Sequence, residues 1–79
     1  MSSINSSKIV ILTCLADGQW WSSYNVASVC GLGLTNASEL LRRYRSQSLV
    51  VRQRNPDVPR GYLYRLTQVG LDRLNYLTP

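Results

Sequence analysis

The chain contains no histidine, and only four of its 79 residues are acidic. The four carboxylates are those of Asp17, Glu39, Asp57 and Asp72. They form no recognisable acid–base pair, and the sequence has no glycine-rich phosphate loop and no nucleophile elbow. Catalysis that depends on histidine or on paired carboxylates is therefore excluded, and we predict that the protein is not an enzyme.

Cysteine is almost as scarce, since Cys14 and Cys30 are the only two. Two cysteines without histidine and without a CxxC pair are too few for a structural zinc site. We expect free thiols that pack as small apolar side chains, as is usual inside the cell. No metal or other cofactor is predicted.

Long apolar stretches are also missing, because no run approaches the roughly 20 residues that span a bilayer. The first eight residues, MSSINSSK, lack the apolar core and cleavage site of a secretory signal. We therefore expect no membrane partner and a cytoplasmic protein, nucleoid-associated or in the host cytoplasm if its source is a virus. Residues 1–79 form one predicted domain, with 1–6 as a frayed tail.

Positive charge is concentrated in one part of the chain. Seven of the nine basic residues lie between positions 42 and 65: Arg42, Arg43, Arg45, Arg52, Arg54, Arg60 and Arg65. Asp57 is the only acidic residue in this segment. With seven positive charges and one negative charge, this segment has a net charge of +6, against +5 for the whole chain, so the remainder is close to neutral. A polyanion is the natural partner of such a segment, because arginine binds phosphate or guanine bidentately.

The first half of the chain predicts two helices. Apolar spacing places one over Ser7–Ala16, with Ile11, Leu12 and Leu15 toward the core and Asp17-Gly18 in the turn that ends it. Trp20-Trp21 forms a short extended piece. Ser22 or Ser23 then caps a second helix with Val26, Ala27 and Cys30 on one face, and Gly31 and Gly33 supply the following turn.

A third helix and a hairpin follow. Ala37, Leu40, Leu41 and Tyr44 give the third helix, about 35–47, a single buried face. Strands are predicted at Leu49–Arg54 and Tyr62–Leu66, joined by a turn-rich loop at 55–61. Thr67 caps a final helix whose inner side carries Leu71, Leu74 and Leu77.

In this order the elements resemble the winged helix-turn-helix family of DNA-binding domains, as found in small prokaryotic, archaeal or viral transcription regulators. Four segments carry the resemblance, which covers nearly the whole chain: ILTCLADG, YNVASVCGL, SLVVRQR and YLYRLTQVG. The expected fold is α+β, with a three-helix core, a β-hairpin wing and a C-terminal helix. The expected function is sequence-specific binding of double-stranded DNA by a transcription regulator.

The resemblance implies a role for each polar residue of the third helix and the wing. The recognition helix, about 35–47, lies in the major groove, where the candidates for base contact are Thr35, Asn36, Ser38, Glu39 and Arg42. Arg43 and Arg45 lie nearer the flanking phosphates. In the wing, about 55–61, Arg54 and Arg60 are placed on the adjacent backbone or in the minor groove.

Structural explanations compete with these roles. Thr35 or Asn36 can cap the third helix, since Asn36 and Glu39 have the spacing of a capping box. Glu39 can pair with Arg43 or accept a hydrogen bond from cytosine. The whole domain can instead be a protein-interaction winged helix or a non-specific architectural DNA binder, and the polar helix face can be an ordinary solvated surface.

Further expectations concern packing and assembly. Trp20 and Trp21 cover the core, Tyr62 and Tyr64 pack under the wing, and Tyr24, Tyr44 and Tyr76 face inward. A disulfide between Cys14 and Cys30 is the alternative to free thiols, because their helices are neighbours in this fold. No small-molecule ligand is evident.

A homodimer is expected through the first helix, the last helix or both. Apolar residues beyond the core stripe of the first helix favour this: Ile4, Ile9, Val10 and Cys14. On the last helix the corresponding residues are Leu71, Leu74, Tyr76 and Leu77.

Overall fold

The computed structural model describes residues 6–78, which form four helices and a small sheet. The elements are α1 (Ser6–Leu15), β1 (Trp21–Ser22), α2 (Ser23–Cys30), α3 (Leu34–Ser46), β2 (Val50–Arg54), β3 (Tyr62–Leu66) and α4 (Gln68–Leu77). Their order is the predicted one, with bounds shifted by a residue or so. Of the predicted tail, residues 1–5 lie outside the described residues, and Ser6 begins α1. Ile4 therefore lies outside them too.

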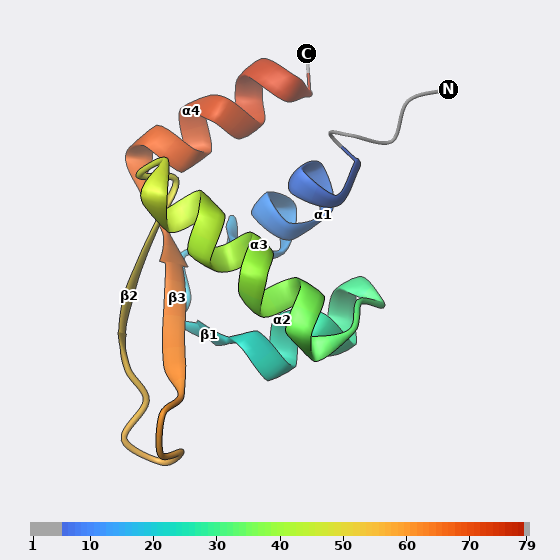
Figure 1. Cartoon of the computed structure of the whole chain (residues 1–79). Helices are drawn as coiled ribbons and strands as arrows, with labels where there is room; N and C mark the ends of the chain where they lie inside the picture. Colours follow the sequence, from blue (N-terminus) through green and yellow to red (C-terminus); the bar gives the residue numbers. More distant parts are fainter. Residues whose placement is uncertain (1–5, 79) are drawn as a thin grey trace.

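The core lies between the helices and the sheet. In Figure 1, α3 crosses the molecule, α1 and α4 lie at one end, and the β2–β3 hairpin extends toward the other end. Twelve apolar side chains are buried at its centre: Ile11, Leu12, Leu15, Val26, Ala27, Ala37, Leu41, Tyr44, Leu49, Val50, Tyr64 and Leu74. Every helix contributes to this list. The predicted stripe of α1 is confirmed in full, Cys30 and Leu40 are partly buried against the core, and of the residues predicted for α4 only Leu74 is buried.

The helix-turn-helix is fixed by its caps. The Ser22 hydroxyl accepts a hydrogen bond from Asn25 N–H (3.0 Å), as predicted for α2. Gly31 ends α2 in the left-handed region, at φ +68°, where glycine avoids the steric cost of a Cβ. The predicted capping role of Thr35 and Asn36 is wrong. Gly33 is the N-cap, so both residues already lie within the first turn of α3.

The sheet is antiparallel, in the order β1-β3-β2. Val50 pairs with Leu66, Arg52 with Tyr64 and Arg54 with Tyr62. Alternation along a strand puts these six residues on one face, the face on which Val50 and Tyr64 are buried. The predicted extended piece at Trp20-Trp21 becomes β1, whose Trp21 pairs with Tyr64.

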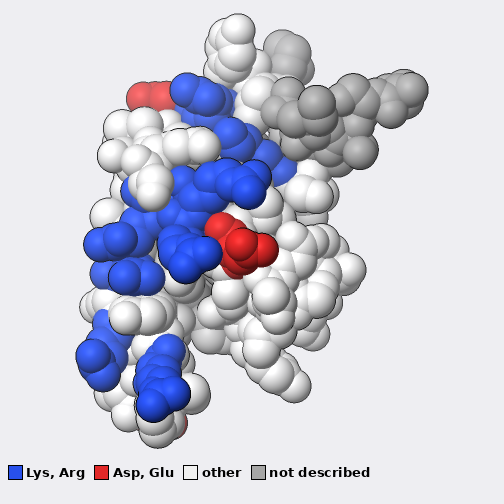
Figure 2. Space-filling view, viewed as in Figure 1, with Lys and Arg blue, Asp and Glu red and all other residues white. Residues whose placement is uncertain are grey.

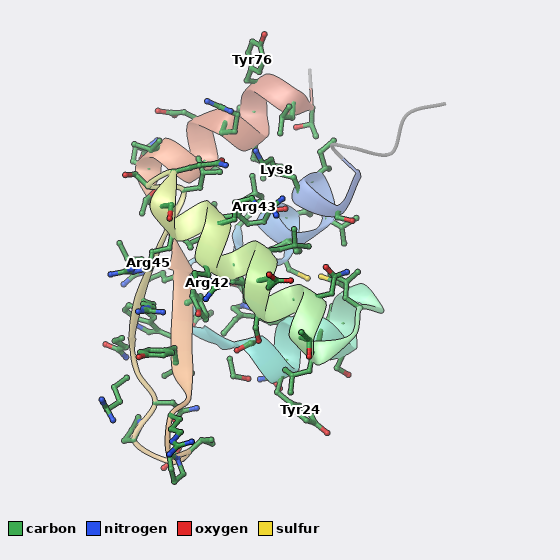
Figure 3. The ribbon with its side chains drawn as sticks, viewed as in Figure 1. Lys8, Tyr24, Arg42, Arg43, Arg45 and Tyr76 are labelled. Carbon is green, nitrogen blue, oxygen red and sulfur yellow. The ribbon has the colours of Figure 1, made fainter. Side chains whose placement is uncertain are left out.

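Three aromatic predictions are wrong. Tyr24 and Tyr76 are 71% and 80% exposed instead of facing inward, and Figure 3 shows them pointing away from the molecule at opposite ends. Trp20 remains 37% exposed instead of covering the core, whereas Trp21 packs against it and donates its Nε1–H to Asp17. The sequence shows which face of a helix is apolar, but it does not show which residues at the edge of that face remain exposed to solvent.

Candidate nucleic-acid interface

The outer face of α3 divides into a central line and two edges. Helical periodicity places Thr35, Glu39 and Arg42 along the centre, opposite the buried Ala37, Leu41 and Tyr44. Ser38 and Arg45 lie on the edge toward the hairpin, and Asn36 and Arg43 lie on the edge toward α1. The predicted recognition residues of α3 therefore share one broad face, but they border different hollows.

One of these hollows lies between α3 and the hairpin and has a volume of about 440 Å³. Its side chains come from the start of α2, the outer face of α3, the inner face of the sheet and the hairpin loop: Ser23, Leu34, Thr35, Ser38, Glu39, Arg42, Arg52, Arg60, Tyr62 and Tyr64. Three guanidinium groups and one carboxylate thus border a single concave surface. Such a surface suits an anionic strand better than an apolar ligand.

A second hollow, of about 320 Å³, lies between α3 and α1 and includes Asn36 and Arg43. Lys8 of α1 lies beside it, and its Nζ donates to Gln47 Oε1 (3.2 Å) and lies 5.4 Å from the centre of the Tyr44 ring. Burial raises the pKa of the Tyr44 hydroxyl, and Arg43 acts in the opposite direction. The ring and the amide hold the Lys8 ammonium near Arg43, as Figure 3 shows.

The hairpin holds its arginines in fixed backbone positions. Arg54 ends β2 on the same face as Arg52, opposite Tyr62. Asn55 organises the loop of the hairpin through two hydrogen bonds. Its side-chain Oδ1 accepts from Asp57 N–H (2.9 Å), and its backbone N–H donates to Gly61 O (3.0 Å). Arg60 has φ +64°, a conformation that few residues other than glycine adopt. The side chain of Arg60 is therefore directed by an uncommon backbone geometry.

Together the basic side chains of α1, α3 and the hairpin form one positive surface, which we call the basic band: Lys8, Arg42, Arg43, Arg45, Arg52, Arg54 and Arg60. Figure 2 shows it as a nearly continuous strip of Lys and Arg that crosses α3 and follows the hairpin to its end, while the surface beside it carries few charges. Figure 3 shows Arg45 on the side of α3 toward the hairpin and Arg43 on the side toward α1, near Lys8. The band supplies the charge and the fork-shaped donors that recognise phosphate.

The acidic residue within the basic band pairs differently from the prediction. Glu39 Oε1 lies 3.8 Å from an Arg42 guanidinium nitrogen, one turn away at i+3, and the predicted pairing with Arg43 is wrong. Arg43 lies on the edge toward α1, whereas Arg42 shares the hollow with Glu39. The Arg42 pair is long and exposed, so it contributes well under about 1 kcal/mol and leaves both groups free to meet a ligand.

The two cysteines meet between α1 and α2. Their sulfur atoms lie 3.5 Å apart as free thiols, a distance that fits a hydrogen bond rather than a disulfide. Burial raises the pKa of Cys30 to about 11, and the hydrogen bond with Cys14 adds to the rise. Cys30 is therefore protonated at neutral pH and is a poor nucleophile. Residues 6–78 contain no group of three or more metal-ligating side chains.

No protein-family model and no curated protein matches the chain, but solved structures match it closely. The PcaV transcriptional regulator from Streptomyces coelicolor, in complex with its natural ligand, is 26% identical, with a TM-score of 0.80 over 89% of this chain and 50% of that one. A MarR family protein from Bacillus stearothermophilus is 20% identical, with a TM-score of 0.77 over 95% of this chain and 51% of that one. MepR in the S. aureus MepR–DNA complex is 20% identical, with a TM-score of 0.81 over 96% of this chain and 63% of that one.

The three matches cover between 89% and 96% of this chain. The chain is a winged helix-turn-helix domain. The predicted α+β fold is thereby confirmed, and the resemblance to transcription regulators agrees with the prediction that the chain is not an enzyme. The chain spans about half the length of PcaV and of the MarR family protein.

The winged-helix geometry adds residues that the sequence did not single out. Arg52 and Tyr62 line the hollow between α3 and the wing, and Lys8 extends the basic band onto α1. The alternation of β2, with Val50 inward, was the signal that could have placed Arg52 on this face. Lys8 had no such signal, since only the packing of α1 against α3 brings it there. Arg65 lies on the opposite sheet face, with its guanidinium 5.8 Å from the Trp20 ring.

Proposed function

We propose that the chain binds double-stranded DNA sequence-specifically and acts as a transcription regulator. The observation that carries the proposal is the basic band, which covers α3 and the wing in a single strip (Figure 2). An α-helix fits the major groove of B-DNA, and a wing beside it reaches the adjacent backbone or minor groove. The MepR–DNA complex supports the proposal, because a fold of the same shape is bound to DNA there.

Within this proposal each part of the interface has its own task. Thr35, Asn36, Ser38, Glu39 and Arg42 face the base edges, Arg43 and Arg45 contact flanking phosphates, and Arg54 and Arg60 contact the backbone or minor groove. A cytoplasmic location follows from such a role. In residues 6–78, no helix is long and apolar enough to cross a membrane.

A salt-dependent titration tests the function directly. Candidate promoter fragments and a random duplex are compared at several salt concentrations, and we expect tighter binding to one promoter fragment together with a steep salt dependence. No measurable duplex binding favours a protein-interaction winged helix. Equal affinity for all sequences favours an architectural DNA binder. PcaV was solved with its natural ligand, and DNA binding by BpsR from Bordetella bronchiseptica is regulated by 6-hydroxynicotinic acid. The titration is therefore repeated with 6-hydroxynicotinic acid present, although the sequence indicated no ligand.

Substitutions on α3 should separate base readout from positioning. Replacing Thr35, Ser38 or Glu39 by alanine should alter sequence preference more than affinity for random DNA, by about 1–3 kcal/mol for a true base contact. All three residues lie within α3 and none is its N-cap, so melting temperatures should stay close to wild type. A variant that loses specific and random binding equally would refute a readout role for that residue.

We further propose that the protein is a homodimer assembled through α1 and α4. At their end of the molecule Val10 is 45% exposed and Tyr76 is 80% exposed, whereas Ile9 packs against the core and Cys14 lies beside Cys30. The available apolar surface is thus narrower than the sequence suggested. This end lies opposite the wing tip, so pairing there leaves both basic bands free (Figures 1 and 3).

Sedimentation at micromolar concentration should show a dimer, and changing Tyr76 and Val10 together to serine should shift it toward monomer. Tyr24→Ser is the matched control, because Tyr24 is comparably exposed at the other end. A wild-type monomer both free and on a palindromic site would exclude the dimer and leave the DNA-binding proposal standing.

A further inference from the structure

Arg52 stacks on an aromatic ring at the edge of a surface hollow. Its guanidinium carbon lies 4.0 Å from the centre of the Tyr62 ring, and the residue is half-buried. Both residues lie on the sheet face turned toward α3, and both line the hollow of about 440 Å³. An arginine stacked on a ring uses the flat face of its guanidinium for the stack, and the N–H groups at the edge remain free to donate.

The position of the hollow decides what it receives when DNA is bound, and this step rests on the proposed function. A major groove and its neighbouring minor groove are separated by one sugar–phosphate strand. If α3 lies in the first groove and the wing reaches the second, that strand must pass between α3 and the wing. The hollow lined by Arg42, Arg52 and Arg60 occupies this place.

We propose that Arg52 is a phosphate contact on the sheet side of this hollow, and that Tyr62 is the positioning residue that holds it. Three guanidinium groups beside the single carboxylate of Glu39 suit a charged phosphate better than an uncharged base edge. Arg52 thus adds a contact that favours duplex DNA of any sequence.

The sheet itself provides a matched control. Arg65 pairs with Val51 on the opposite face, and it lies over an aromatic ring as Arg52 does, at 5.8 Å from the centre of Trp20. Arg52→Ala and Arg65→Ala remove the same charge from neighbouring strands. A difference between these two variants therefore reports the position of the charge rather than its loss.

The first experiment measures binding of the full chain to a random duplex and to its preferred fragment by fluorescence anisotropy at several salt concentrations. Arg52→Ala should weaken both by roughly tenfold and lower the salt slope by about one unit. Arg65→Ala should change the slope far less. Equal effects of the two variants would overturn the phosphate contact, and so would a loss confined to the preferred fragment.

The second experiment tests the positioning role of Tyr62 with a double-mutant cycle. Tyr62→Leu should weaken DNA binding by about two- to fivefold, Tyr62→Phe should restore it because the ring remains, and Tyr62→Leu should have no further effect in the Arg52→Ala background. Additive losses would overturn the role of Tyr62. Thermal melting of each variant identifies any loss that comes from unfolding.

Failure of this inference is distinguishable from failure of the proposed function. If the wild-type chain binds no duplex, the proposed function fails and the hollow has no phosphate to receive. If the wild type binds and Arg52→Ala binds equally well, the DNA-binding role stands and the inference about Arg52 fails.

Discussion

Removing four arginines of the basic band together should lower affinity for any duplex by about a hundredfold or more and reduce the salt slope by as much as about four units. The combined variant changes Arg42, Arg43, Arg54 and Arg60 to alanine. Each phosphate that an arginine neutralises releases counterions, and the slope counts these contacts. All four side chains are exposed, so the fold should be retained. Anisotropy titrations at several salt concentrations measure both quantities.

A variant with lysine at the same four positions is the matched control. It keeps the charge and loses the planar fork, so it should retain most of the salt slope while losing part of the affinity for the preferred fragment. The single variants show whether the contacts add independently. If the alanine combination binds random duplex as the wild type does, the basic band is not the DNA-binding surface.

The sequence was sufficient where local chemistry decides the structure. The Ser22 and Thr67 caps, the left-handed Gly31 and the apolar stripe of α3 each depend on neighbours within a few residues in the chain. The same locality made the outer face of α3 predictable, because a helix that buries Ala37 and Leu41 must turn its remaining side chains outward. The positions of the α3 candidates therefore followed from periodicity alone.

Sequence reasoning failed where a tertiary contact decides between equally good local choices. Asn36 has a good capping side chain, but the backbone enters α3 earlier, at Gly33. Glu39 can reach either Arg42 or Arg43, and only the packed helix shows which one shares its hollow. The sequence identifies Arg52 only as one of the clustered arginines, because its stack on Tyr62 depends on the register of β2 against β3.

These contacts also explain how so small a domain presents a defined interface. Leu49 lies directly before β2 and links it to two helices. Its N–H donates to Tyr44 O (2.9 Å) near the end of α3, and its carbonyl accepts from Thr67 N–H (3.0 Å) at the start of α4. The Thr67 hydroxyl donates to Ser48 O (2.6 Å) and accepts from Gly70 N–H (2.9 Å). The base of the wing is thereby fixed relative to α3.

Gly70→Ala should be the most destabilising single methyl addition at this joint. Gly70 is buried, and a Cβ there would overlap the Leu49 carbonyl oxygen and lie 2.6 Å from Leu66 Cδ1. Since a backbone oxygen cannot move away alone, α4 or β2 must shift, and the Thr67 hydrogen bonds weaken. We expect a loss of about 3 kcal/mol or more, from a total of about 4–12 kcal/mol for a chain of this length. The melting temperature should fall by at least about 12 °C.

Gly33→Ala is the matched control, because a Cβ at Gly33 meets nothing within 4 Å and its φ of −67° suits any residue. It should change the free energy of unfolding by less than about 1 kcal/mol. Below its lowered melting temperature, Gly70→Ala should also bind DNA less tightly, since the wing no longer has a fixed position beside α3. A Gly70→Ala protein that melts and binds like the wild type would show that the joint at Leu49 neither stabilises the domain nor positions the wing.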